Sequence, residues 1–483
     1  MRFASIQRVV GFLIAGSSLM MLPPALVSWW YHDGTFVLFL MSAAILLLAG
    51  LVVFLPVRHA HRELRLRDGF LIVVGCWLAL ALVGALPFLL LMTPEISYVD
   101  ALFESMSGLT TTGATIMTNI EALPRAMLYY RQQLQWLGGM GIIVLAVASL
   151  PMLRIGGIQL YRAETPGPMK DAKLTPRIME TAKALWLIYL GITVVCVLAY
   201  WLGGMTLFDA VGHAFSTVAI GGFSTHDASL AFFDNPTIEL VAVIFMFIAG
   251  MNFALHFTAW RRASAQPYFL DPELKTYAFL LVGLAVLASF ALYLNGTYDT
   301  VAEAVRYAGF QVVSAMTTTG FTSTEFHLWS GFVPILMMCV AFIGGCAGST
   351  AGGMKVIRVI LLYRQSAREI RRLIHPHSVV HVKIGGQKAS NSVIDAVWGF
   401  FFLYIATFTL VVVLLNATGI DSVTAFSAAA ACITNLGPGL ADVGSNYAEL
   451  NGAAKLILSF AMLAGRLEIY TLLVLLTPAF WRD

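Results

Sequence analysis

Charged residues are scarce in this sequence, since Asp, Glu, Lys and Arg make up 11% of its 483 residues, against roughly 25% in a soluble domain. Cysteine is also scarce: the five cysteines lie far apart in apolar stretches without CxxC spacing, which indicates neither disulfides nor a zinc site. A net charge of +3, with no basic run interleaved with aromatic residues, gives no indication of nucleic-acid binding. Because 59% of the residues are apolar, a water-soluble globule would expose a large apolar surface, so soluble enzyme folds are excluded as the default.

Long apolar runs are what the sequence has in abundance. A bilayer core about 30 Å thick requires about 20 apolar residues per spanning helix, and about ten such runs are present. They cover residues 9–30, 36–56, 69–92, 132–152, 184–202, 236–258, 276–295, 331–363, 394–416 and 454–479. The sequence therefore predicts an all-α polytopic membrane protein with about ten transmembrane helices.

Lys and Arg are concentrated in every second connection between these runs, within residues 58–67, 154–183, 261–275 and 364–388. Because positively charged loops remain in the cytoplasm, we expect both termini to be cytoplasmic. The opposite connections are acidic and carry, among others, Asp100, Glu104, Asp209 and Asp227. An acidic outer face would concentrate cations.

The acidic connections also contain four similar segments, each ending in a glycine. These glycines are Gly113, Gly222, Gly320 and Gly437. In every copy an Ala lies twelve residues before the glycine, and a small residue lies six before it. Such a repeat indicates four units of helix, short amphipathic segment, glycine loop and helix. We expect a helix pair at 1–66, followed by pore repeats at 67–175, 176–270, 271–385 and 386–483.

The segment before each glycine spans about ten to fourteen residues, which is too short to cross a bilayer and indicates a re-entrant half-helix. Four such half-helices around one pseudo-fourfold pore would turn backbone carbonyls inward, where they can replace the hydration shell of a monovalent cation. The predicted carbonyls belong to Thr111, Thr112, Ile220, Gly221, Thr318, Thr319, Asn435 and Leu436, and the four glycines would hold the loops open. The alternative role of membrane glycines is close helix packing, which we prefer for Gly138, Gly139 and Gly141.

Four further stretches, in combination with the loops, carry a resemblance to a known family. They are residues 131–141, 161–168, 344–355 and 465–468. Together they resemble hallmarks of the TrkH type within the Trk/Ktr/HKT superfamily of potassium transporters, over nearly the whole chain. The resemblance implies potassium as the transported ion, the bacterial inner membrane, a homodimer with one pore per subunit, and a cytoplasmic regulator of the TrkA type that binds NAD or ATP.

Within the superfamily, serine at the first filter glycine accompanies sodium transport, so Gly113 is similar to the potassium-preferring form. The fourth loop departs from the pattern, because Asn435 and Leu436 stand where the first and third loops carry threonines. The filter is therefore expected to be imperfectly symmetric, with modest selectivity.

The run 331–363 is too long for one span and has glycines and small residues in its middle, where helix propensity falls. Irregular backbone at that depth must be buried in protein or line a wet cavity. We interpret the segment as a gate beneath the filter, and a buried structural break is the alternative. The gate residues are Gly344, Gly345, Gly348, Ser349, Thr350, Gly352, Gly353 and Lys355.

Arg466 lies inside the last run, where an arginine costs about 2.5 to 3.5 kcal/mol on insertion scales and is expected to face the bundle interior. The resemblance places this arginine in the pore just inside the filter, as part of the gate. An ion pair with Glu468, or a side chain that extends to the membrane surface, remains an alternative.

Other classes of membrane protein fit the sequence less well. A secondary transporter would show inverted repeats and ionisable residues at mid-membrane, whereas these repeats are parallel. An intramembrane enzyme would need paired aspartates or a Ser/His constellation, and Asp395 has no partner in the sequence, so we expect no enzyme. A proton- or sodium-coupled potassium symporter and a weakly selective sodium/potassium transporter both remain open.

Overall fold

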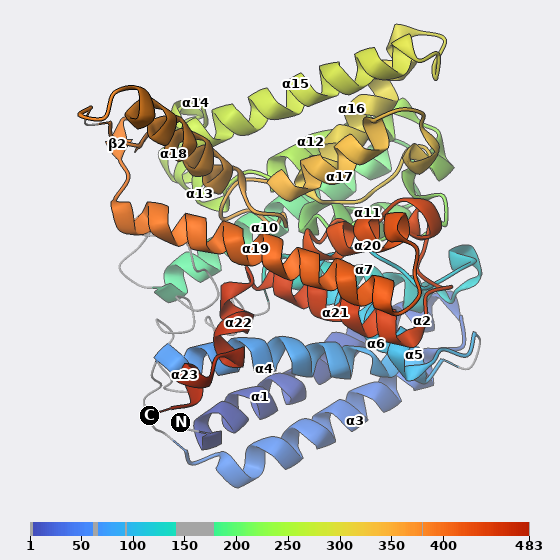
Figure 1. Ribbon diagram of the computed structural model, residues 1–483. Helices are drawn as coiled ribbons and strands as arrows, with labels where there is room; N and C mark the ends of the chain where they lie inside the picture. Colours follow the sequence, from blue (N-terminus) through green and yellow to red (C-terminus); the bar gives the residue numbers. More distant parts are fainter. Residues whose placement is uncertain (1–2, 61–65, 92–93, 142–177, 379, 483) are drawn as a thin grey trace.

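The computed structural model describes residues 3–60, 66–91, 94–141, 178–378 and 380–482, which form a bundle of long helices (Figure 1). Within these described residues, six helical stretches are long and apolar enough to cross a membrane, and two more candidate spans are bent helix pairs. The first two spans are formed by α1 (Phe3–Ser17) with α2 (Leu22–Tyr31), and by α3 (Phe36–Phe54). The predicted fold class, an all-α membrane protein with re-entrant half-helices, is confirmed.

Four similar units follow, and each consists of three helices in chain order. We call them the outer helix, the short pore helix and the inner helix. The outer helices are α4 (Leu66–Gly84), α10 (Ile178–Leu202), α15 (Pro272–Leu294) and α19 (Asn391–Ala417). The pore helices are α6 (Tyr98–Leu109), α11 (Leu207–Ala219), α16 (Val301–Thr317) and α20 (Ser422–Ile433). The inner helices are α7 (Arg125–Gly139), α12 (Pro236–Ala249), α17 (Val333–Ile343) and α21 (Gly452–Arg466).

The pore helices close these units into a ring. Each one packs against the outer and the inner helix of its own unit. Each also packs against the inner helix of the unit before it, in the pairs α7 with α11, α12 with α16, α17 with α20 and α21 with α6. Because the last pair joins the fourth unit to the first, the four units surround one axis.

A repeated capping sequence starts the pore helices. The Ncap hydroxyl accepts a hydrogen bond from the backbone amide three residues on, and donates to the carboxylate of that same residue. This arrangement occurs in the pairs Ser97 with Asp100, Thr206 with Asp209, and Thr300 with Glu303. Asp421 caps the fourth pore helix with its carboxylate. These caps fix where each re-entrant helix begins.

Three inner spans are broken in the described part of the chain, although the sequence predicted one break. The run 331–363 is interrupted as expected, between α17 and α18 (Val356–Ile374). The runs 236–258 and 454–479 were predicted to be continuous, but α12 meets α13 (Phe253–Arg262) at 89° and α21 meets α22 (Tyr470–Leu476) at 117°. At the first bend the side chain of Asn252 caps α13, and the carbonyl of Gly250 accepts from the amide of Cys346 at 2.9 Å. Contacts with segment 344–355 therefore satisfy backbone groups freed by this bend.

The smaller elements lie at the ends of the bundle. They are α5 (Leu86–Leu89), α14 (Gln266–Leu270), α23 (Pro478–Trp481), and the hairpin of β1 (Lys383–Ile384) with β2 (Gln387–Lys388). Both chain termini lie at the same end of the bundle as β2 (Figure 1). The predicted limits of the repeats stay predictions, and the limit at 175 lies outside the described residues, as do the stretch 161–168 and most of the basic connection 154–183.

Candidate ion pathway

The four glycine loops share one backbone conformation. Two residues before each glycine the chain is left-handed, with φ of 55° at Thr111, 55° at Ile220, 62° at Thr318 and 58° at Asn435. The glycines themselves have φ of 82°, 78°, 81° and 99°. β-branched residues rarely adopt positive φ, so the surrounding structure enforces the turn in at least three loops.

Matching hydrogen bonds close the C-terminus of each pore helix. The amide of the residue before the glycine donates to the carbonyl of the small residue noted in the repeat, as in a Schellman motif. The pairs are Thr112 with Ser107 at 2.9 Å, and Gly221 with Ser216, Thr319 with Ser314 and Leu436 with Ala431 at 2.8 Å each. The small residue six positions before each glycine therefore accepts the same hydrogen bond in all four repeats.

Each glycine lies against a carbonyl of the next loop around the ring. A β-carbon at Gly113, Gly222, Gly320 or Gly437 would come closer than 3.0 Å to the carbonyl oxygen of Gly221, Thr319, Leu436 or Thr112, in that order. With the loops numbered 1 to 4 in chain order, the four contacts form a closed ring, because loop 4 contacts loop 1. Any side chain at one of these glycines would therefore displace a carbonyl that the sequence predicted to line the ion site.

The loops lie between two cavities, which we call the outer cavity and the inner cavity. The outer cavity, of about 470 Å³, is lined by all four loop glycines together with Asp227, Glu325 and other residues. The inner cavity, of about 230 Å³, is lined by Asn435, Arg466 and much of segment 344–355. The eight residues with predicted site carbonyls are buried between the two cavities.

A buried ion pair supports the outer ends of loops 1 and 2. Glu104 of α6 and Arg131 of α7 form a contact of 2.8 Å, and both side chains are almost fully buried. The Glu104 carboxylate accepts from the amide of Ile116 at 2.9 Å, while Arg131 donates to the carbonyl of Ser224 at 3.2 Å. The expectation that Glu104 belongs to an acidic outer surface is therefore wrong. Its buried carboxylate instead pairs with Arg131 and accepts a hydrogen bond from the chain that follows Gly113.

Segment 344–355 forms hydrogen bonds at the C-terminal ends of three pore helices. Gly352 donates its amide to the hydroxyl of Thr318 at 2.7 Å, and Gly353 donates to the carbonyl of Thr434 at 3.1 Å. The hydroxyl of Thr350 donates to the carbonyl of Val218 at 3.1 Å. The segment thus crosses beneath loops 2, 3 and 4.

Segment 344–355 and the first turn of α18 are both attached to α15. The Glu273 carboxylate accepts from the amides of Ala347 at 2.7 Å and Ile357 at 3.1 Å. Within the segment, the Lys355 ammonium donates to the carbonyl of Ala351. Gly344, Gly348 and Gly353 have positive φ, which a side chain would disfavour, so the glycines of the predicted gate match the conformation of this backbone.

Arg466 lies beside the first glycine loop. Its guanidinium donates to the hydroxyl of Thr111 at 3.3 Å and to the carbonyl of Thr350 at 3.1 Å. It also donates to the carbonyls of Gly138 at 2.5 Å and Gly139 at 3.0 Å, at the end of α7. One side chain therefore connects loop 1, α7 and the intramembrane segment, while Glu468 forms an ion pair of 2.5 Å with Arg358.

Comparison with known proteins agrees with this architecture. A family model described as a cation transport protein, TrkH, matches residues 36–482. The chain is 53% identical to the Trk system potassium uptake protein TrkH of Halomonas elongata and 49% identical to that of Escherichia coli strain K12, with 100% of both chains covered in each case. The crystal structure of the potassium transporter TrkH from Vibrio parahaemolyticus superposes with a TM-score of 0.91 at 51% identity, again over 100% of both chains.

The chain belongs to the TrkH family of cation transport proteins. With the fold, this membership makes it a multi-pass membrane protein that shares the family's transport architecture. The expected packing role of two α7 glycines is also confirmed. A β-carbon at Gly138 would collide with the carbonyl of Leu109, and one at Gly139 with Ala219.

The supporting role of several polar residues around the loops of this TrkH-family protein was not predicted from the sequence. Glu104, Arg131, Gln135 and Glu273 are buried, and each contacts a glycine loop, the chain just beyond one, or segment 344–355. Their signal in the sequence is a charged or amide side chain inside or beside an apolar run, where it requires a buried partner. That pattern identifies the residues, but the partners lie on other helices or loops, and for Arg131 and Gln135 in the next repeat, so they are visible only in the fold.

The mouth of the outer cavity carries a pair of hydrogen-bonded carboxyl groups. Desolvation, with a side-chain hydrogen bond to Glu121 and the charge of that residue, raises the pKa of Asp227 to about 6. The Asp227 carboxylate accepts a hydrogen bond from the backbone amide of Ile120 at 2.9 Å. The backbone amide of Asp227 donates to the carboxylate of Glu121 at 3.1 Å. This pair joins the chain beyond loop 1 to the chain beyond loop 2.

Proposed function

We propose that this chain mediates potassium uptake across the bacterial inner membrane, through a channel-like pore whose four glycine loops form a carbonyl selectivity filter. The cyclic contact of each loop glycine with a carbonyl of the next loop carries the proposal. The relatives named above are potassium uptake proteins, and full-length identity near 50% supports the same cargo here.

The chemistry of the ring suits a partly dehydrated monovalent cation. Backbone carbonyls at Thr111, Thr112, Ile220, Gly221, Thr318, Thr319, Asn435 and Leu436 would replace water oxygens around potassium. All four pore helices end at the loops, so the negative ends of their dipoles also favour a cation. Cavities on both sides of the loops give the ion a hydrated approach and exit.

Segment 344–355 and Arg466 would control passage below the filter. The segment contacts three pore helices from the inner side, and Arg466 lines the same inner cavity. A fixed positive charge there repels a cation at close range. Opening would require the segment to exchange its hydrogen bonds to Thr318, Thr434 and Val218 for others.

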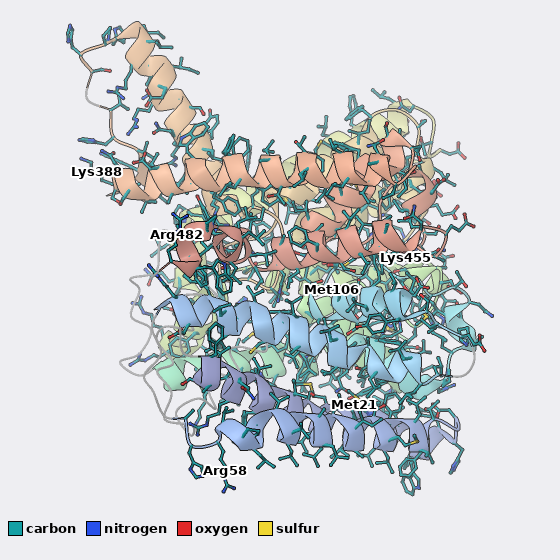
Figure 2. The ribbon with its side chains drawn as sticks, turned by 60° about the horizontal axis from the view of Figure 1, so that its bottom comes forward. Met21, Arg58, Met106, Lys388, Lys455 and Arg482 are labelled. Carbon is teal, nitrogen blue, oxygen red and sulfur yellow. The ribbon has the colours of Figure 1, made fainter. Side chains whose placement is uncertain are left out.

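A cytoplasmic TrkA-type regulator that binds NAD or ATP is the proposed source of that opening, acting on a homodimer whose termini are cytoplasmic. Helix α18 continues directly from segment 344–355, and its second half projects from the end of the bundle near Lys388 (Figure 2). Tyr363, Ile370 and Leu373 on this helix are exposed. Exposed apolar side chains beside arginines suit a protein partner better than water, so α18 is the proposed link between regulator and gate.

The mode of transport is tested by current recordings from protein reconstituted in bilayers under opposing potassium and proton gradients. A passive pore reverses at the potassium equilibrium potential at every proton gradient. A reversal potential that moves with the proton or sodium gradient would instead support an ion-coupled symporter. A reversal potential set almost equally by sodium and potassium would support a weakly selective transporter.

The role of α18 in docking is tested by reversing the charges of Arg368, Arg371 and Arg372. These three arginines lie in the second half of α18. Co-purification with the regulator and nucleotide-dependent flux are then measured. We expect both to fall while flux without the regulator stays at its basal level. Intact binding and regulation would exclude α18 as the docking site.

A further inference from the structure

The glycine loops are braced by three different devices. In loops 1 and 3 a hydroxyl pair closes the turn: Thr110 with Thr112 at 2.8 Å, and Thr317 with Thr319 at 2.7 Å. In loop 4 the Asn435 amide donates to the Thr112 hydroxyl at 3.0 Å and to the carbonyl of Met462 at 2.9 Å. Loops 1, 3 and 4 are therefore held by side chains of their own residues.

Loop 2 has no side chain that could do this. The two positions that carry the hydroxyl pair in loops 1 and 3 are Ala219 and Gly221, and Ile220 between them is apolar. The number and placement of the carbonyl oxygens around the ion determine which cation a ring prefers, so each loop must present its oxygens to the ion. An unbraced loop would be the least constrained part of the ring.

Gln135 of the inner helix α7 occupies the place of the missing brace. Its Nε2 donates to the carbonyl of Gly221 at 2.6 Å, and its Oε1 accepts from the amide of Phe223 at 3.0 Å. The two bonds fix the orientation of the amide, because a carbonyl can only accept and a backbone amide can only donate. One side chain thus grips loop 2 on both sides of Gly222.

The fit between Gln135 and loop 2 is mutual. Gln135 is fully buried, and a β-carbon at Gly221 would come closer than 3.0 Å to its amide group. Gly221 is thus a glycine because the glutamine fills the space of its side chain. The bonded oxygen of Gly221 is also the one that faces Gly113 across the ring.

We propose that Gln135 is a positioning residue for the filter, which holds the Gly221 carbonyl in the ring and thereby sets potassium-over-sodium selectivity. The inference rests on the proposed function. It assigns to α7 a part in selectivity that the four loops alone do not supply.

The test uses Gln135→Met, which keeps the length of the side chain and removes both hydrogen bonds, in the full-length protein reconstituted in lipid vesicles. The matched control is Gln133→Leu, because Gln133 is a buried glutamine of the same helix that bonds instead to the carbonyl of Met20 at 2.7 Å. Gln135→Asn, whose shorter side chain cannot reach both partners, is the second variant if Gln135→Met does not fold. The potassium-over-sodium permeability ratio is read from reversal potentials, and folded protein is counted by size-exclusion chromatography.

We expect Gln135→Met and Gln135→Asn to lower the permeability ratio by roughly fivefold to tenfold, the effect of losing one or two buried hydrogen bonds, while Gln133→Leu keeps the wild-type ratio. A folded Gln135 variant with the wild-type ratio would overturn the inference. Gly113→Ser separates this failure from that of the proposed function. If Gly113→Ser lowers the ratio and the Gln135 variants do not, only the role of Gln135 is lost; if none of them changes it, the filter itself is misassigned.

Discussion

The backbone amide of Gly352 donates a hydrogen bond of 2.7 Å to the hydroxyl of Thr318. Gly352 belongs to the intramembrane segment and Thr318 to the third glycine loop, at the position where that loop is left-handed. The bond is therefore a direct connection between the proposed gate and the proposed filter. Because the Thr318 side chain is fully buried, water does not compete for the bond, and its loss costs more than the loss of an exposed contact.

Removing this bond should favour the open state. Thr318→Val keeps the shape of the side chain and deletes the hydroxyl, so the segment loses one contact that holds it beneath the filter. We expect potassium uptake without the regulator to rise several-fold, measured as rubidium tracer flux into vesicles. Thr407→Val, a buried substitution within α19, is the control and should leave the flux unchanged.

Shortening the segment tests the same gate without altering the filter. A deletion within 346–351, which leaves Gly352 and Gly353 in place, should keep potassium flux high even without the regulator, because less backbone lies under the pore. A shortened protein that folds and stays closed would mean that the segment is structural and that the gate lies elsewhere.

Arg466 should slow the passage of cations. Arg466→Ala removes a positive charge from the inner cavity and also the bonds to Thr111 and Thr350, so we expect higher potassium flux per folded protein. Arg466→Lys keeps the charge and should stay closer to the wild type. Equal flux for Arg466→Ala and wild type, at equal amounts of folded protein, would leave this arginine a purely structural role.

The buried pair Glu104 and Arg131 should dominate stability near the filter. Glu104→Ala leaves the Arg131 charge buried without its partner, which typically costs about 3 to 5 kcal/mol. Glu369→Ala breaks an exposed pair with Arg372 at 3.5 Å and should cost less than about 1 kcal/mol. Thermal unfolding of the purified variants in detergent compares the two, and a similar small shift for both would contradict the assignment.

Potassium entry from the outer side should depend on pH near 6. The raised pKa of Asp227 keeps its carboxyl group neutral below about pH 6, so the outer cavity gains a negative charge as the pH rises through that value. More negative charge concentrates cations, and the apparent affinity for potassium should therefore increase with pH, with Glu121, Arg131 and His226 as the neighbouring charged or titratable groups. Asp227→Asn should remove this component, and an unchanged pH profile in that variant would exclude Asp227 as its source.

The sequence predicted the elements of this fold whose signal is local. The apolar runs, the register of the four glycines and the break after Ile343 all follow from composition and spacing within short stretches, and the structure has each of them. The bends before Phe253 and after Arg466 were not predicted, because neither run has a glycine-rich stretch like that at 344–353, and partners elsewhere in the chain contact each bend.

The same limit applies to the candidate site. The eight carbonyls could be proposed from the repeat alone, because backbone geometry repeats with sequence register. The side chains that hold the loops could not, since the contact of Gln135 with Gly221 and that of Glu104 with Arg131 cross from one helix to another. Asn435 was recognised as a departure from the threonine pattern, and its amide in fact joins loop 4 to Thr112 of loop 1.

The central claim, that four loops form one filter, is tested most directly by the potassium-over-sodium permeability ratio of four equivalent variants. The variants are Gly113→Ser, Gly222→Ser, Gly320→Ser and Gly437→Ser, with Gly309→Ser as control because a β-carbon at Gly309 meets nothing within 4 Å. Each ring variant displaces one carbonyl, so the account predicts a fall of about tenfold at all four positions and no change in the control. Folded ring variants that keep the wild-type ratio would contradict it.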